Sequence, residues 1–404
     1  MRQNRTARRA GASVLVVGLC AALASGCATA DQQAGKTTSV GAPVKVAVVY
    51  SKTGALSTYG AEYLAGFQAG LGYATGGTGS IDGHEIQVTY ADDGGDPAKA
   101  VAATKQYVGE GYSIVAGTTD SGIATQLAPI AEQNKILYIS GPAASDAITG
   151  ANKYTFRSGR QTYQDVATAG TFVGKPQGKK VLVFAQDSVF GKGNAKAVEK
   201  VLGARGAQVS TLLVPSGTSD LTPFAQQAKQ AGSDLVFVAW AGDSTGAMWQ
   251  ALDQQGVLAS STVTTGLGNA ASFSAYGAAT SKINFLSYYF PGAPSNPVNQ
   301  AMTDAITKAG ATPDLFSPDG FVAAQMIAHA VQATGGGANV DAMVGALEGW
   351  TFDAPKGSTT IRPGDHAMLQ PMFQATLGPV GSGFAPKLVA TVPTADTAPP
   401  QSAG

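Results

Sequence analysis

A short polar turn between a strand and a helix holds the side chains with the clearest chemical potential. The turn Gly117–Gly122 (GTTDSG) follows the apolar run Ile114–Ala116. Apolar residues then recur with the spacing of one helix face, at Ile123, Leu127, Ile130 and Ala131. The first N–H groups of a helix lack internal partners and carry the positive end of its dipole. The helix start therefore suits a ligand carboxylate or carbonyl.

Ser121 lies at the predicted start of this helix, where its hydroxyl can direct a hydrogen bond to a ligand. In open α/β sheets, small ligands bind at the carboxyl ends of the strands, which is where such a turn lies. The alternative is that Asp120 or Ser121 only caps the helix, which requires no ligand. The organisation of the whole chain favours the ligand-binding interpretation.

Residues 1–27 have the pattern of an export signal and take no part in the predicted fold. Arginines open the chain, and the apolar segment Gly11–Ala24 is too short for a permanent membrane span. The segment ends in LASGC, which resembles a bacterial lipobox and implies cleavage before Cys27 and lipidation of its sulfur. The alternative is an ordinary secretory signal in which Cys27 is incidental. We therefore expect an exported protein, anchored by lipid to the outer face of the cytoplasmic membrane.

The mature chain has two low-complexity ends around a large body. Residues 28–43 are small and polar and predict a flexible tether, whereas 393–404 are rich in Pro, Ala and Thr and predict a disordered tail. Because Cys20 lies inside the signal, the mature chain has no cysteine pair for an internal disulfide. The 26 basic and 26 acidic residues balance, with no basic cluster in the mature part, which argues against a nucleic-acid partner.

Strands and helices alternate along the body. Val44–Tyr50 and Ile136–Ile139 read as buried strands, and the same alternation resumes after Arg157 with strands at Lys180–Phe184 and Leu235–Trp240. Such alternation predicts parallel sheets covered by helices. Two successive blocks of it predict two similar lobes rather than one large sheet. The predicted fold class is therefore α/β, with two parallel-sheet, Rossmann-like lobes.

The sequence offers little support for a metal site or for catalysis. The aspartates of Asp92–Pro97 match no known calcium loop, and Asp96 with Pro97 is the pattern of a helix N-cap and first helical position. The histidines lie far apart and lack metal-ligand spacing. GTTDSG places a serine after a strand but shows no matched base, although a distant His–Asp pair remains open. We expect a protein that is not an enzyme and that carries no cofactor and no metal.

The order of several short segments says more than any one of them. The segments begin at Val44 (VKVAVVYSKTGALSTYG), Tyr90 (YADDGGDPAKAV), Ile136 (ILYISGPAAS), Phe184 (FAQDSVFGKG) and Thr351 (TFDAPKGSTTIRPGDHAMLQPMFQA). Together with the turn at Gly117–Ser121, this order resembles the branched-chain amino-acid-binding proteins, the solute receptors of ATP-driven importers. The resemblance spans Val44 to Leu377.

The resemblance implies a type I periplasmic-binding-protein fold, in which two lobes joined by three hinge crossings close on a ligand. The crossings are expected near Phe156–Gly159, Ser287–Pro291 and Lys356–Arg362. The first lobe would then be 44–157 plus 290–357, and the second 158–288 plus 362–392. Several crossings make closure a guided rigid-body rotation.

The resemblance also implies a set of ligand contacts. The Ser121 hydroxyl and the N–H groups of Ser121 and Gly122 would bind a ligand carboxylate or carbonyl. The following loop would meet the ligand with backbone atoms and a hydroxyl, at Ala143, Ala144 and Ser145. Tyr59 would contribute an aromatic ring beside the first strand, and Trp240 would cover the ligand from the second lobe. The alternatives are a helix staple for Tyr59, plain core for Trp240 and a simple turn for the alanines.

One position departs from the family pattern. Amino-acid-binding members place an acidic residue after a strand of the second lobe to hold the ligand ammonium, whereas this chain has Leu267 in that turn. Because an unpaired buried ammonium is costly, either Asp243 or Asp120 takes the acidic role or the ligand carries no ammonium. The expected ligand is a branched-chain amino acid or a related amide or carboxylic acid.

The expected partners are an importer permease and its ATPase, to which a lipid-anchored receptor would deliver the ligand. The alternative is a ligand-sensing module, because the same fold serves sensors of amides and amino acids.

Overall fold

The computed structural model describes residues 41–402. The predicted signal at 1–27, the lipidation site Cys27 and most of the tether at 28–43 lie outside the described residues.

The first sheet has six strands in the order β2-β3-β1-β4-β5-β6. Their bounds are β1 Val44–Tyr50, β2 Ser80–Ile81, β3 His84–Asp92, β4 Ile114–Ala116, β5 Leu137–Ser140 and β6 Thr155–Arg157. The pairing is parallel from β3 to β6, and β2 adds an antiparallel edge. Strand β4, which precedes the polar turn, is completely buried, as its run of apolar residues predicts.

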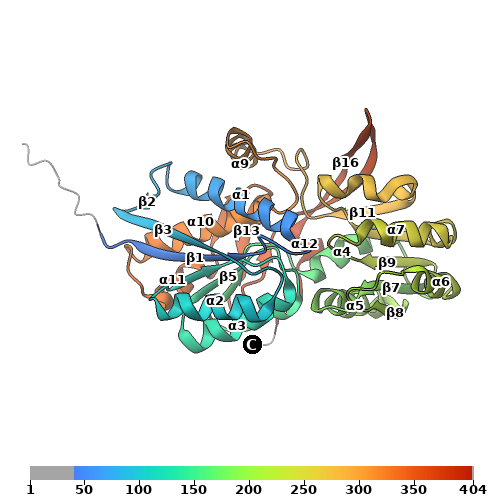
Figure 1. Ribbon diagram of the computed structural model, residues 1–404, viewed down its shortest axis with the longest axis horizontal. Helices are drawn as coiled ribbons and strands as arrows, with labels where there is room; N and C mark the ends of the chain where they lie inside the picture. Colours follow the sequence, from blue (N-terminus) through green and yellow to red (C-terminus); the bar gives the residue numbers. More distant parts are fainter. Residues whose placement is uncertain (1–40, 403–404) are drawn as a thin grey trace, which may run out of the picture. The chain divides into compact units, whose positions relative to one another are not determined.

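Helices cover both faces of this sheet. In Figure 1, α2 (Pro97–Gly109) and α3 (Ser121–Asn134) lie on one face, and α1 (Ser57–Ala74) and α10 (Ser317–Ala333) on the other. Glycines set the close crossing of α1 and α10, because a Cβ at Gly66 or Gly320 would overlap a backbone carbonyl oxygen of the other helix. This packing fixes the start of α1 beside the carboxyl ends of the strands.

The second sheet has seven strands in the order β16-β15-β11-β10-β9-β7-β8. The parallel strands are β7 Lys180–Gln186, β8 Gln208–Val214, β9 Leu235–Ala239, β10 Thr262–Gly266 and β11 Ile283–Ser287. An antiparallel pair closes one edge, β15 Met372–Val380 with β16 Gly383–Val392. The accompanying helices are α4 Thr162–Val173, α5 Val189–Val201, α6 Thr222–Gln230, α7 Thr245–Gln254 and α8 Val257–Ser260. The two-sheet α/β architecture predicted from the alternation is therefore confirmed.

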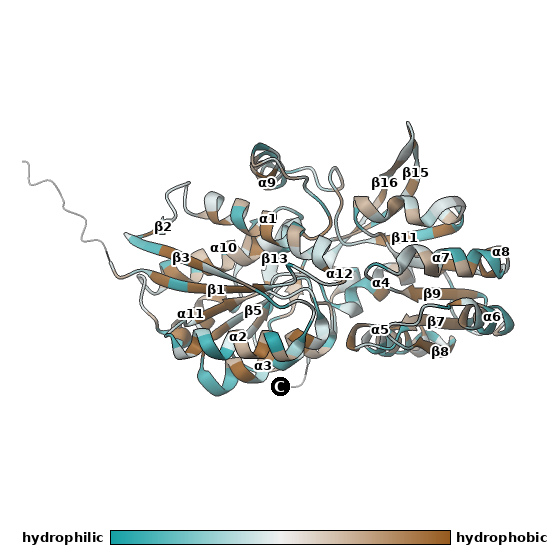
Figure 2. Ribbon diagram, in the orientation of Figure 1, coloured by the Kyte–Doolittle hydropathy of each residue, from teal (hydrophilic) through white to brown (hydrophobic). Residues whose placement is uncertain are grey.

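Apolar side chains concentrate in the strands of both sheets, as the brown ribbons of Figure 2 show. A further core joins Tyr288 and Phe316 to α9 (Pro297–Lys308) and to the side of α1. Each sheet thus has its own apolar core, and burial of that surface is the main source of stability. Within residues 41–402, no helix combines the length and the hydrophobicity that a membrane crossing requires.

The last passage from the first sheet to the second lies later than expected. Helix α11 (Val340–Leu347) leads into a small antiparallel sheet, which consists of β12 Thr351–Ala354, β13 Gly357–Ile361 and β14 Met368–Leu369. Ile361 and Met368 pair across it and belong to the core of the first sheet. Residues 362–369 therefore stay with the first sheet, and the chain crosses between Leu369 and Met372 instead of at Lys356–Arg362. The pairing of β13 with β14 keeps this segment beside the first sheet.

The expectation of disorder in the tail is wrong for residues 393–402. A short helix, α12, spans Thr394–Thr397. Beyond it, Arg362 donates to the carbonyl oxygen of Pro399 at 2.7 Å, and the N–H of Ser402 donates to Asp365 at 3.0 Å. The composition of the tail gave no sign of these partners, which lie more than thirty residues earlier in the chain.

Candidate ligand-binding site

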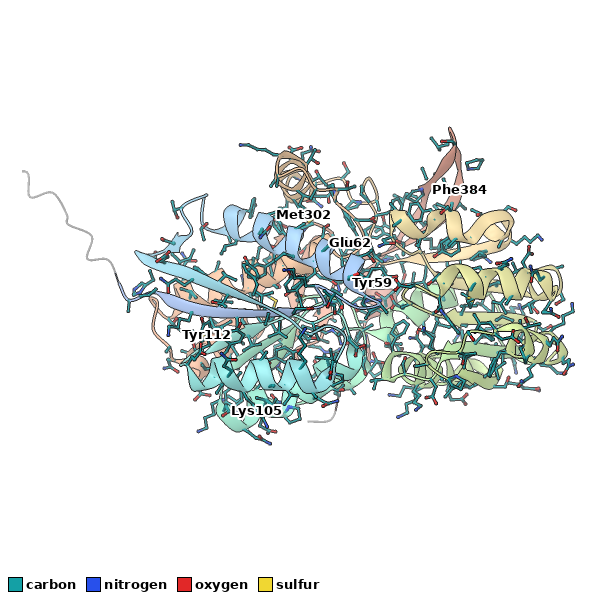
Figure 3. The ribbon with its side chains drawn as sticks, viewed as in Figure 1. Tyr59, Glu62, Lys105, Tyr112, Met302 and Phe384 are labelled. Carbon is teal, nitrogen blue, oxygen red and sulfur yellow. The ribbon has the colours of Figure 1, made fainter. Side chains whose placement is uncertain are left out.

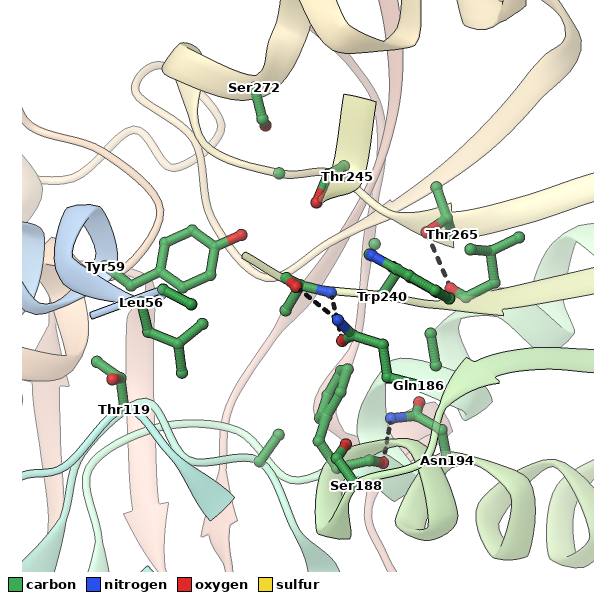
Figure 4. A pocket seen from close by; sticks show the side chains of 18 of the residues that line it. Leu56, Tyr59, Thr119, Gln186, Ser188, Asn194, Trp240, Thr245, Thr265 and Ser272 are labelled. Carbon is green, nitrogen blue, oxygen red and sulfur yellow. Dashed lines mark hydrogen bonds between the residues drawn. The ribbon is translucent and has the colours of Figure 1, made fainter. Parts of the chain in front are cut away.

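A cavity of about 600 Å³ is lined by loops at the carboxyl ends of strands from both sheets (Figure 4). The first sheet and its helices contribute the start of α1, the turn after β4, the loop after β5 and the segment after β6. The second contributes the loops after β7, β8, β9 and β10, together with residues at the end of β11. The cavity has the size typical of pockets for small organic ligands. Of the predicted site residues, the cavity is lined by Tyr59, Ser121, Ala144, Trp240, Asp243 and Leu267.

Ser121 and Asp120 take separate positions at the start of α3. Asp120 is the N-cap, and its Oδ1 accepts from the N–H of Ile123 at 3.0 Å. Ser121 lines the cavity, and its Oγ accepts from the N–H groups of Ala144 at 3.1 Å and Ser145 at 3.2 Å. Because a hydroxyl has two acceptor lone pairs and one proton, Ser121 keeps only its proton for a further partner. The serine is thus set up as a donor toward the cavity.

Three predicted residues lie beside the cavity without lining it. Ala143 is fully buried, and its carbonyl oxygen accepts from Arg157 at 2.7 Å. The Oγ of Ser145 accepts from the N–H of Ala147 at 3.3 Å and begins the short 3₁₀ helix that follows. Gly122 follows Ser121 in the first turn of α3. These residues shape the wall that carries Ser121 and Ala144.

Aromatic rings form much of the remaining wall. Tyr59 meets the ring of Phe316 edge-on, with 4.9 Å between the centroids. Burial raises the pKa of Tyr59, so this hydroxyl keeps its proton at neutral pH. On the other side, Trp240 stacks on Phe184 at 5.7 Å, and its Nε1–H donates to Ser244 at 2.9 Å. Figure 4 shows Tyr59 and Trp240 on opposite sides of the pocket.

Arg160 lines the cavity and was not predicted from the sequence. Its Nε donates to Asp165 Oδ2 at 3.1 Å, and its Nη1 donates to the carbonyl oxygen of Pro142 at 2.8 Å. Its Cζ lies 5.4 Å from the ring centroids of both Tyr288 and Phe316. It is the one basic residue among the described residues that line this cavity. The signal in the sequence was a pair of arginines, Arg157 at the end of β6 and Arg160 three residues later.

Arg157 has a different role from its neighbour. It is 1% exposed, and its guanidinium donates to backbone carbonyl oxygens including those of Ala143 and Arg160. Burial lowers its pKa to about 10. Arg157 therefore holds the loops that carry the site, whereas Arg160 faces the cavity itself.

The acidic residues along the cavity differ in how far they are engaged. Asp165 is paired with Arg160, and Asp120 caps α3. Asp243 is exposed and has no hydrogen bond or ion pair with any described residue. Leu267 is 3% exposed, so the turn where amino-acid-binding relatives were expected to be acidic presents an apolar surface here.

Two further carboxyl groups, which do not line the cavity, connect segments that carry lining residues. Glu62 lies on α1 near Tyr59 (Figure 3), and its oxygens accept from Asn269 Nδ2 at 2.6 Å and from the N–H of Phe316 at 3.2 Å. The neighbouring Asp314 accepts from the N–H of Ala270 at 2.8 Å. Burial, together with the nearby Asp314, raises the pKa of Glu62 to about 8. The loop after β10 is thus joined to α1 and to the start of α10.

The arrangement gives no support to metal or nucleophilic chemistry among residues 41–402. No group of three or more His, Cys, Asp or Glu side chains there could hold a metal ion. The Oγ of Ser121 is engaged by backbone N–H groups rather than by a base. Asp96 caps α2 through the N–H of Ala98 at 2.8 Å.

Comparisons with known proteins point to one family. The periplasmic binding protein profile matches residues 43–382. The Leu/Ile/Val-binding protein homolog 2 of Brucella abortus is 25% identical over 372 residues, which are 90% of this chain and 95% of that protein.

Solved structures agree with this assignment. An ABC-type branched-chain amino acid transporter structure from Rhodopseudomonas palustris is 32% identical, with a TM-score of 0.74 over 89% of this chain and 99% of that one. A solute-binding protein of an R. palustris ABC transporter, in complex with 4-hydroxybenzoate, shares the fold at 23% identity, with a TM-score of 0.79 over 87% of this chain and 97% of that one. The chain therefore belongs to the periplasmic binding protein family and has its two-lobed α/β fold, which confirms the resemblance expected from its sequence motifs.

Proposed function

We propose that this protein is the extracytoplasmic solute receptor of an ATP-driven importer. It captures a small organic ligand in the cavity described above and delivers it to a permease whose ATPase supplies the energy. The observation that supports this most is the donor arrangement at the start of α3. There, Ser121 accepts two backbone N–H groups and keeps its proton for the cavity.

The ligand is anchored by its acidic or carbonyl end at Ser121 and the first turn of α3. A relative is named Leu/Ile/Val-binding protein homolog 2, and a structural neighbour was solved with 4-hydroxybenzoate; both names point to ligands that carry a carboxylate, the group that this anchor would bind. The free N–H groups and dipole of the helix start favour the negative charge. Tyr59 and Trp240 then enclose the organic part of the ligand from the two sides.

Closure follows from the division of contacts between the two lobes. A ligand held by the first lobe gains contacts with Trp240 and Leu267 only when the second lobe is close. Binding therefore shifts the population toward the closed form. The permease would recognise this closed form. The ligand leaves unchanged, because the function is binding and transfer.

Attachment to the membrane is proposed through Cys27. Metabolic labelling with a fatty acid should label the wild-type protein and not a Cys27→Ser variant, and the variant should move from the membrane to the soluble fraction. Equal labelling of both proteins would contradict a lipid at Cys27.

The test of the receptor function is a thermal-shift screen of the mature protein followed by titration calorimetry. The panel holds aliphatic and aromatic amino acids, their amides, and aliphatic and aromatic acids. A ligand that binds only the folded state raises the melting temperature. Recovery of the bound compound by mass spectrometry then checks that it is chemically unchanged. Absence of any binding across the panel would argue against a receptor for such solutes.

A further inference from the structure

We propose that Arg160 is the cation that binds the ligand carboxylate, and that the pocket selects a monocarboxylic acid with a flat apolar body over an α-amino acid. This inference rests on the proposed receptor function and names the ligand class of the same site.

The guanidinium of Arg160 has donors left over. Its Nε is used by Asp165, and its Nη1 has one acceptor, the carbonyl oxygen of Pro142. Its Nη2 donates to no acceptor within residues 41–402, although a guanidinium carries five N–H donors. Because Arg160 lines the cavity, a ligand carboxylate is the group that would complete its hydrogen bonding.

One short loop holds Arg160 and Ser121 together. Arg160 donates to the carbonyl oxygen of Pro142, and two residues later the N–H of Ala144 donates to the Oγ of Ser121. Both anchors are buried, with Arg160 at 9% and Ser121 at 4% exposure. A guanidinium donor and a hydroxyl proton therefore approach the cavity from the same wall. A carboxylate can accept from both at once and brings a negative charge to the guanidinium, whereas a neutral amide oxygen can accept from both but lacks that charge.

Most carboxylates that line the cavity already have partners, which disfavours an ammonium group in the ligand. Asp165 is already paired with Arg160, and Asp120 uses its Oδ1 to cap α3. Leu267, which faces the cavity from the second sheet, is apolar. Among the three acidic residues that line the cavity, Asp243 alone makes no hydrogen bond or ion pair with a described residue, and it is exposed. A buried ammonium without a carboxylate is costly, and Arg160 would add repulsion between like charges.

The aromatic rings on the cavity wall favour a flat ligand body. The Phe316 ring contacts the Arg160 guanidinium and also meets the Tyr59 ring edge-on. These two contacts fix the position of the Phe316 ring. Trp240, stacked on Phe184, faces Tyr59 across the pocket. Aromatic side chains in such positions pack well against the faces or edges of a ring in the ligand.

The first experiment uses the wild-type protein and compares benzoate, benzamide, phenylalanine and leucine by titration calorimetry. We expect benzoate to bind and benzamide to bind about 10- to 100-fold more weakly, the range for losing a hydrogen bond to a charged partner. Phenylalanine and leucine should bind more weakly than benzoate. Tight leucine binding with no benzoate binding would overturn the ligand class and leave the receptor function intact. No binding by any of the four, or by the wider panel, would count against the receptor function itself.

The second experiment assigns the effect to Arg160. Arg160→Gln should reduce benzoate affinity about 10- to 100-fold and bring benzoate and benzamide to similar affinities, whereas Arg160→Lys should retain part of the preference for the anion. The matched control is Arg205→Gln, since Arg205 is exposed and donates to Gly174 away from the cavity. Melting curves of the unliganded variants report whether they fold. If Asp243→Asn abolishes binding of an amino acid while Arg160→Gln leaves it unchanged, the assignment to Arg160 is wrong.

Discussion

Replacing Ser121 with alanine should have two separable effects, one on the empty protein and one on the ligand. The Oγ of Ser121 accepts two buried N–H groups, from Ala144 at 3.1 Å and Ser145 at 3.2 Å. Both donors lose their acceptor in the variant. Since each unsatisfied buried donor costs about 1–3 kcal/mol, we expect the two together to lower the free energy of unfolding by about 2–6 kcal/mol.

The expected loss of ligand affinity depends on the hydroxyl proton of Ser121, which has no acceptor among its backbone partners. If it donates to a carboxylate in the closed pocket, the lost bond is one to a charged group, which is worth about 1.5–3 kcal/mol. The dissociation constant should then rise about 10- to 100-fold. Titration calorimetry measures this change, and denaturant unfolding of the unliganded protein measures the stability term.

A matched serine separates the two effects. Ser158 is buried, and its Oγ donates to the carbonyl oxygen of Ser140 at 3.2 Å, but it does not line the cavity. Ser158→Ala should therefore lower stability by about 1 kcal/mol and leave the affinity unchanged. If Ser121→Ala loses stability yet binds ligand as well as the wild type, the hydroxyl has only a structural role. If neither quantity changes, the geometry proposed for Ser121 is refuted.

Three other predictions follow from the same structure. Because burial raises the pKa of Glu62 from 4.5 to about 8, the folded state holds a proton that the unfolded state has lost. The unfolding free energy should therefore fall as pH rises between these values, and Glu62→Gln should flatten this slope in melting curves taken across that range. Gly66→Ala should destabilise the protein by about 1–3 kcal/mol or more, since the added Cβ would meet α10, whereas Gly72→Ala on the same helix meets nothing and should be neutral or stabilising in the same melts. Trp240→Ala should weaken ligand binding by about 1–3 kcal/mol through lost apolar burial, with calorimetry as the measure and an unchanged affinity as the contradicting result.

The start of α3 shows which features of the site the local sequence could predict. A polar turn between a buried strand and a helix was expected to place Asp120 and Ser121 at the helix start, with capping and ligand contact as alternatives. In the structure, Asp120 caps the helix, and both Asp120 and Ser121 line the cavity. The deciding contacts of Ser121 come from Ala144 and Ser145, more than twenty residues away.

The position of Arg160 at the cavity could not be predicted from the local sequence. Arg157 ends β6 and Arg160 follows it by three residues, and nothing in the local sequence predicts their different roles. In the structure, Arg157 is buried and donates to backbone carbonyl oxygens, whereas Arg160 lines the cavity. This difference depends on the loop after β5, which packs against both side chains and which no periodicity describes.

The sequence by itself determined the alternation of strands and helices, and with it two mostly parallel sheets, because apolar spacing is a local property that each element carries. It also determined that polar turns would gather at the carboxyl ends of the strands. Only the tertiary structure decided that the β13–β14 segment stays with the first sheet, that residues 393–402 pack on Arg362 and Asp365, and which charges face the cavity. These outcomes depend on contacts between residues that are distant in the chain, where hydrogen-bond partners and burial are set by packing rather than by neighbours in sequence.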